Sequence, residues 1–121
     1  MENIFTSIAR RETTLSPLME GREKIDTDKV IELYPEGFTV INFDIITTGL
    51  DTYPIIIIKE DNSKFIFGGA IMKNICAGWV EQFDGDIESA SKALESAGGV
   101  HMKFEKARTK NGNNLTKPVI L

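Results

Sequence analysis

The basic residues of this chain are concentrated near its C-terminal end. Five of the fourteen lysine and arginine residues lie within residues 99–121, together with a single acidic residue, Glu105, so this segment has a net charge of +4. Because the net charge of the whole chain is −4, residues 1–98 carry −8. A positive segment on an otherwise acidic protein favours contact with an anion, and a phosphate backbone is the anion that best fits it.

Polar side chains of this basic segment are the first candidate binding residues. Asparagine amides can donate to phosphates or bases, and Gly112 allows a close approach of the backbone. The candidates for nucleic-acid binding are Lys103, Lys106, Arg108, Lys110, Asn111, Asn113, Asn114 and Lys117. Two observations favour another interpretation: lysines also protect exposed hairpin edges from aggregation, and the chain as a whole is acidic.

Three aromatic residues are the second group of candidates. Phe65 and Phe67 lie two positions apart in an expected strand and therefore project from the same face, and Tyr53 begins the neighbouring strand. Proteins that bind single strands stack bases on exposed rings of this kind. Alternatively, both phenylalanines fill the core, which is the commoner place for this residue, whereas the Tyr53 hydroxyl favours a wet setting.

No group of residues indicates catalysis or metal binding. The sequence contains one cysteine, Cys76, and one histidine, His101, which excludes an internal disulfide and a zinc site built from these residue types. Asp84, Asp86 and Glu88 lack the remaining ligands of a calcium loop and are better explained by helix capping. No nucleophile–base set or carboxylate pair emerges, so we expect a non-enzymatic protein without a cofactor.

Strands must position most of these residues. The sequence Asp26-Thr-Asp28 predicts the start of a short helix that ends before Pro35. Runs of β-branched and aromatic residues then predict strands, with a hairpin turn at Asn111-Gly112 between the last two. The strands are expected at 38–46, 53–59, 64–67, from Val100 onward, and at 115–121.

A helical segment separates the third and fourth of these strands. Ile71, Ile75, Trp79 and Phe83 recur every four residues and predict a helix whose apolar face, with a buried Trp79, packs on the core. Asp86 is expected to cap a second helix, which would end in left-handed backbone at 98–99.

This order of elements predicts a mainly β protein with a helical insertion. Three strands, a helical segment and two further strands are the order of an OB-fold, a five-stranded barrel. An open α+β sheet with the helices on one face is the alternative. Residues 1–24 are interpreted as an N-terminal arm, either flexible or with one helical turn, and residues 25–121 as a single domain.

Residues 37–121 resemble small phage-encoded single-stranded-DNA-binding proteins of the OB type. The resemblance lies in layout and loop chemistry: Phe65-Ile-Phe-Gly-Gly69 before a helix, Gly98-Gly-Val100, Lys103-Phe104 and Thr109-Lys-Asn-Gly-Asn-Asn-Leu115. It implies a role in a phage or prophage replication or recombination module. Such proteins often end in an acidic tail that recruits partners, whereas this chain ends in Lys117-Pro-Val-Ile-Leu121, so we do not expect recruitment through a tail.

The sequence therefore predicts binding of a single-stranded nucleic acid, with DNA or RNA left open, through the C-terminal hairpin and the face of the second and third strands. The expected protein partners are replication or recombination proteins and further copies of the chain. Without a signal-peptide pattern or a long apolar run, we expect a cytoplasmic protein, in the host cytoplasm for a phage gene, and no membrane partner. A non-catalytic protein–protein interaction module of a phage or mobile element is the alternative.

Overall fold

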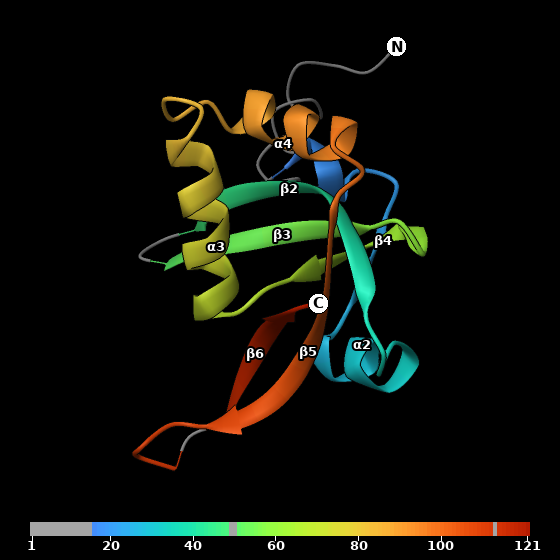
Figure 1. Ribbon diagram of the computed structural model, residues 1–121, viewed down its shortest axis with the longest axis vertical. Coiled ribbons are helices and arrows are strands. Elements are labelled where there is room, and N and C mark those ends of the chain that lie inside the picture. The colour runs from blue at the N-terminus through green and yellow to red at the C-terminus, as the bar shows by residue number, and fades with distance from the viewer. Residues whose placement is uncertain (1–15, 49–50, 113) are drawn as a thin grey trace, which may run out of the picture.

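The computed structural model describes residues 16–48, 51–112 and 114–121. It is mainly β with a helical insertion, as the sequence predicted, but the sheet has six strands where five were expected; it is curled into a half-barrel with helices packed around it (Figure 1). The elements are η1 (Pro17–Met19), β1 (Glu23–Ile25), α2 (Thr27–Leu33), β2 (Phe38–Thr48), β3 (Asp51–Ile58), β4 (Asp61–Phe67), α3 (Ala70–Glu81), α4 (Ile87–Ser96), β5 (Val100–Arg108) and β6 (Asn114–Ile120).

The strands follow the order β1-β4-β3-β2-β5-β6. Strands β2, β3 and β4 form an antiparallel meander, and the chain returns through α3 and α4 to place β5 beside β2. A strand that returns by a long connection to lie beside the first strand of a meander makes a Greek key. Strand β1 pairs in parallel with β4 and was not expected, because its residues fell at the end of the predicted arm.

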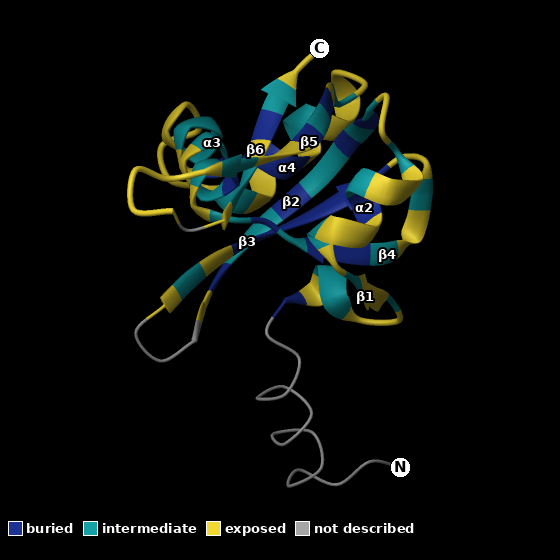
Figure 2. Cartoon of the chain, turned by 90° about the horizontal axis from the view of Figure 1, so that it is seen from below, coloured by how far each residue is buried: buried dark blue, intermediate teal, exposed yellow. Residues whose placement is uncertain are grey.

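The sheet is apolar on both faces, which explains the continuous run Ile55–Ile58 in β3. Successive side chains alternate between faces. Ile56 and Ile58 belong to the larger core beneath the helices, whereas Ile55 and Ile57 belong to a second cluster on the opposite face, and all four are buried (Figure 2). Because the apolar side chains of β3 point to both faces of the sheet, a cluster on each face is needed to bury them all.

Part of the predicted N-terminal arm covers the second cluster. Leu18 and Met19 of η1 pack against it, and the buried Ser16 hydroxyl donates a hydrogen bond of 2.5 Å to the carboxylate of Asp44 in β2. Arg22 extends this attachment, since its Nε donates to the carbonyl oxygen of Asn62 at 2.7 Å. Residues 16–25 are therefore bound to the sheet.

The helices partly follow the predicted pattern. Trp79 of α3 is half-buried and packs edge-on against Phe43, with 5.3 Å between ring centroids. The expected burial of Phe83 is wrong: α3 ends at Glu81, and the side chain of Phe83 is 39% exposed beside a turn in which Asp84 and Gly85 have positive φ. No helix in the described ranges is long and apolar enough to cross a membrane.

The connection from α4 to β5 depends on glycine. Gly98 and Gly99 both have left-handed backbone, with φ of +88° and +84°, as the sequence predicted for the end of this helix. A Cβ atom on Gly99 would also lie 2.5 Å from the carbonyl oxygen of Val40 in β2. Gly99 therefore allows β5 to begin directly beside β2.

Candidate nucleic-acid interface

Strands β3 and β4 bring the three predicted aromatic residues together. The Phe67 ring lies edge-on between Tyr53 and Phe65, with centroid distances of 6.1 Å and 5.5 Å. Phe65 is only 6% exposed and belongs to the second apolar cluster, whereas Tyr53 is 36% exposed and Phe67 is half-buried. Tyr53 and Phe67 thus reach the surface, and Phe65 supports Phe67 from within.

Strand β1 brings charge to this aromatic group. The Lys24 Nζ atom lies 5.2 Å from the centroid of the Phe67 ring, within range of a cation–π interaction, and 3.6 Å from Oδ1 of Asp26. An ion pair of 2.7 Å between Glu23 and Lys64 joins β1 to β4. The hydrogen bond and the charge of Lys64 lower the pKa of Glu23, and the same interaction raises the pKa of Lys64.

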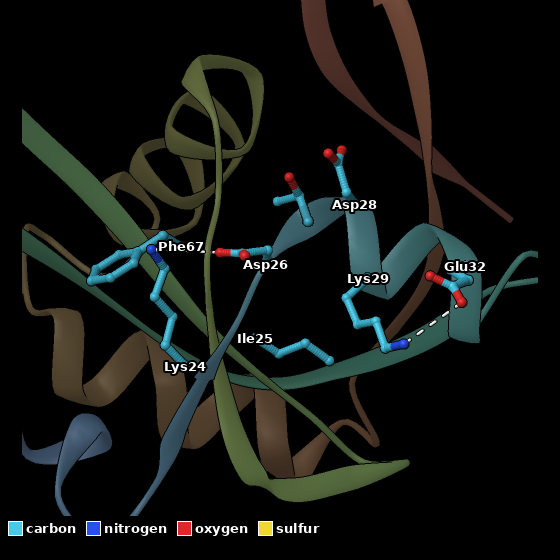
Figure 3. Close-up of a pocket in the computed structure, with 8 residues that line it drawn as sticks. Lys24, Ile25, Asp26, Asp28, Lys29, Glu32 and Phe67 are labelled. Atoms are coloured by element: carbon cyan, nitrogen blue, oxygen red, sulfur yellow. Dashed lines mark ion pairs between the residues drawn. The ribbon is translucent and has the colours of Figure 1, made fainter.

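A groove of about 550 Å³ extends from Phe67 along the junction of β1 and α2; we call it the Phe67 groove (Figure 3). Its lining is mixed in charge and consists of Lys24, Ile25, Asp26, Thr27, Asp28, Lys29, Glu32 and Phe67. Asp26 takes the N-cap position of α2, as predicted, but its side chain makes no capping hydrogen bond. Its carboxylate pairs with Lys24 instead.

The C-terminal hairpin forms as predicted. Strands β5 and β6 pair from Met102 with Ile120 to Arg108 with Asn114, and the Gly112 amide donates to the Thr109 carbonyl oxygen at 2.9 Å to close the turn. The predicted binding residues Lys106, Arg108, Lys110, Asn111, Asn114 and Lys117 are exposed, Lys103 is half-buried, and Asn113 lies outside the described residues. In Figure 2 the described part of this turn is exposed.

Two of the hairpin lysines form ion pairs with carboxylates of the same chain. Lys103 Nζ lies 3.1 Å from Oε1 of Glu105, and Lys106 Nζ lies 3.3 Å from Oδ1 of Asp28 in α2. All four side chains are at least partly exposed, so each pair contributes about 0–1 kcal/mol to stability. An incoming phosphate can replace either carboxylate at little cost.

The N-terminal end of α2 connects the aromatic group to the hairpin. A second, smaller groove is lined by Asp28, Lys106, Asn114, Leu115 and Thr116, so the two grooves share Asp28. The Thr116 hydroxyl also donates to the hydroxyl oxygen of Thr27 at 3.5 Å. The two grooves therefore meet at Asp28, with Phe67 in the lining of one and Lys106 in the lining of the other.

Sequence reasoning did not assign a site role to the junction of β1 and α2. Lys24 fell within the expected arm, and Asp26-Thr-Asp28 was interpreted only as the start of a short helix. A three-residue strand that pairs with a distant segment leaves no local periodicity, so no sequence signal places Lys24 beside Phe67.

In the described part of the chain, neither the cysteine nor the acidic and histidine side chains form a reactive or metal-binding cluster. Cys76 is buried in the larger core, and burial raises its pKa to about 12, which keeps the thiol protonated and unreactive near neutral pH. Within residues 16–48, 51–112 and 114–121, no three His, Cys, Asp or Glu side chains gather closely enough to hold a metal ion.

Comparisons of the chain with protein-family models, curated proteins and solved structures found no match. Its function is therefore inferred from the geometry and charge of its own residues.

Proposed function

We propose that this protein binds single-stranded DNA without catalysis. The observation that carries the proposal is that the groove at Phe67, the ring beside Tyr53, and the groove at the basic β5–β6 hairpin share Asp28 in their linings. Rings for stacking and cations for phosphates are the two components from which sequence-tolerant single-strand binding is built.

The topology supports an OB-type barrel as the fold behind this function. An OB-fold is a five-stranded, partly open Greek-key barrel that binds its ligands on the second and third strands and on the loops that follow the first and fourth. The Greek key of β2 to β5, followed by β6, fits this description. In that correspondence Tyr53 and Phe67 lie on the second and third strands, the hairpin turn is the last loop, and β1 is an addition.

Stacking on Tyr53 and Phe67 supplies the contact with bases. By alanine substitution, such contacts are worth about 1–3 kcal/mol per base. A ring can stack only on a base whose face is exposed, and in a duplex both faces of each base are covered by its neighbours. This requirement favours single strands over double strands.

The hairpin supplies the contact with phosphates. Arg108, Lys110 and Lys117 project from its exposed surface, and Lys103 and Lys106 join them when a phosphate replaces their carboxylate partners. The exposed amides of Asn111 and Asn114 add donors beside them. These contacts neutralise the backbone and do not read sequence.

The proposal includes a phage or prophage origin of the protein and a location in the host cell. The resemblance of residues 37–121 to phage single-stranded-DNA-binding proteins supports a role in a replication or recombination module, in the host cytoplasm. Single-stranded RNA remains the alternative ligand, because stacking and phosphate contacts do not distinguish the two sugars.

One observation favours a second candidate function, docking of the hairpin on an acidic protein. Lys103 and Lys106 already bind carboxylates within the chain, at Glu105 and Asp28. A partner that presents carboxylates with the same spacing would satisfy these lysines equally well.

A fluorescence-anisotropy titration tests the proposal. The protein is titrated against labelled oligo(dT), oligo(rU) and a DNA duplex of one length, each at low and high salt. We expect the tightest binding to oligo(dT), with affinity that falls as salt rises. Equal binding to the duplex would contradict the proposal, tighter binding to oligo(rU) would make RNA the ligand, and no binding at low salt would favour the protein-docking function.

A further inference from the structure

Carboxylates occur in the Phe67 groove where phosphate binding alone does not explain them. Asp26, Asp28 and Glu32 line the groove beside Lys24 and Lys29. A carboxylate repels the phosphate backbone that the proposed function brings to this surface. On a nucleic acid, a carboxylate can instead accept hydrogen bonds from the N–H groups along the edge of a base.

Asp26 is the carboxylate best placed to meet such an edge. Its side chain makes no capping hydrogen bond, it is exposed, and its Oδ1 lies 3.6 Å from Lys24 Nζ. That ammonium group in turn lies 5.2 Å from the centroid of the Phe67 ring. Figure 3 shows the Lys24 ammonium between the ring and the Asp26 carboxylate, so an aromatic face, a donor and an acceptor meet at one end of the groove.

The four bases present different edges to such a pair. The Watson–Crick edge of guanine has an acceptor, O6, followed by two adjacent donors, N1–H and the N2 amine. A carboxylate accepts two adjacent donors at once, and an ammonium group beside it donates to the neighbouring acceptor. Thymine, cytosine and adenine have no two adjacent donors on this edge. The other three bases can offer such a pair one donor and one acceptor, but only guanine offers the carboxylate two donors and the ammonium group an adjacent acceptor.

We propose that the Phe67 groove binds one guanine of a bound single strand. The base stacks on Phe67, Asp26 accepts hydrogen bonds from N1–H and the N2 amine, and Lys24 moves off the ring to donate to O6. Both charged side chains are more than half exposed, so they can reorient without disturbing the core. This inference rests on the proposed function and adds a base preference to it.

Competition between oligonucleotides that differ at one base tests the inference. Labelled oligo(dT), the same strand with one central guanine, and the same strand with hypoxanthine at that position are titrated against the native protein. Hypoxanthine keeps O6 and N1–H but lacks the N2 amine. We expect the guanine strand to bind about fivefold more tightly than oligo(dT), and the hypoxanthine strand to fall between them.

Two variants identify the groups responsible. Asp26→Ala is expected to bind the guanine strand and oligo(dT) equally. Glu88→Gln, which removes an exposed carboxylate of α4 outside the groove, is expected to keep the preference. Equal binding of both strands by the native protein, or a guanine preference that survives in Asp26→Ala, would overturn the inference while leaving single-strand binding intact. Absence of binding to every strand would overturn the proposed function together with it.

Discussion

Lys106 of β5 and Asp28 of α2 form an ion pair, with 3.3 Å between Nζ and Oδ1. The pair lies where the groove at the hairpin meets the Phe67 groove. A carboxylate of the protein thus holds a lysine that the proposed function assigns to a phosphate. In the free protein, the Asp28 carboxylate occupies the position beside Lys106 that the proposed function assigns to a phosphate of the nucleic acid.

Removing this carboxylate should strengthen binding. In the native protein, Lys106 must leave the Asp28 carboxylate before it can bind a phosphate. Asp28→Asn removes this competing anion, so we expect affinity for oligo(dT) to rise about two- to fivefold at low salt. The free energy of unfolding should change by less than about 1 kcal/mol, because the pair is exposed. Anisotropy titration and urea denaturation measure the two quantities.

Glu88→Gln is the matched control for Asp28→Asn. It also neutralises one carboxylate of an exposed ion pair, 3.0 Å from Lys92, but in α4. Equal gains in affinity in the two variants would show that only net charge matters and that the position of Asp28 does not.

Leucine substitutions should separate the two phenylalanines of β4. Phe67→Leu keeps apolar volume but removes the stacking face, and we expect it to weaken oligo(dT) binding about five- to tenfold. Phe65→Leu alters a buried side chain, so it should lower the free energy of unfolding by about 1–2 kcal/mol with little effect on affinity. If titration showed the loss of affinity in Phe65→Leu and denaturation showed the loss of stability in Phe67→Leu, Phe65 would be the stacking ring and Phe67 the core residue.

Alanine substitutions should show why β5 needs a glycine at its start. Gly99 and Gly85 have nearly the same positive φ, +84° and +85°, but only Gly99 is crowded by backbone. Gly85→Ala should cost about 1 kcal/mol through backbone strain alone. Gly99→Ala should cost at least about 1 kcal/mol more, because β5 must move away from the Val40 carbonyl. Equal losses in urea denaturation would contradict the close approach.

The Glu23–Lys64 ion pair predicts a pH-dependent contribution to stability. Because Lys64 lowers the pKa of Glu23 from its ordinary value of 4.5, the contribution is complete above pH 4.5. It is lost as the pH falls through the lower pKa of the folded state. We therefore expect Glu23→Gln to have a lower Tm than the native protein at neutral pH, with a difference that shrinks below pH 4.5. A Tm difference that grew in acid would contradict the assigned shift.

The sequence predicted those elements that a short run of neighbouring residues specifies, such as turns and helix ends. The hairpin follows from Asn111-Gly112, the end of α4 from its two glycines, and α2 from the polar residues before it. Phe83 shows the limit of such patterns. The four-residue spacing continues to Phe83, but the turn at Asp84 and Gly85 ends the helix first and leaves the ring exposed.

Contacts between distant segments account for what the sequence did not reveal. Residues 16–25 have neither a strand-length run nor a helical period, and their order comes from the Ser16–Asp44 hydrogen bond and from pairing with β4. The same pairing places Lys24 on Phe67 and creates the Phe67 groove. Charge segregation identified the hairpin, but it did not show that Asp28 would bind one of its lysines.

The salt dependence of binding by a hairpin variant tests the central claim most directly. In Arg108→Gln/Lys110→Gln, two phosphate contacts are removed, and each contact lowers log affinity by about 0.7 per unit of log salt concentration. We expect weaker binding to oligo(dT) and a salt slope flatter by about 1.4, with a free energy of unfolding changed by less than about 0.5 kcal/mol.

Lys59→Gln/Lys92→Gln removes the same charge outside the hairpin, from the β3–β4 turn and from α4, and should leave the salt slope close to that of the native protein. A slope that flattens by about 1.4 in the hairpin variant but not in this control is the result that the account predicts. An unchanged slope and affinity in the hairpin variant would contradict it.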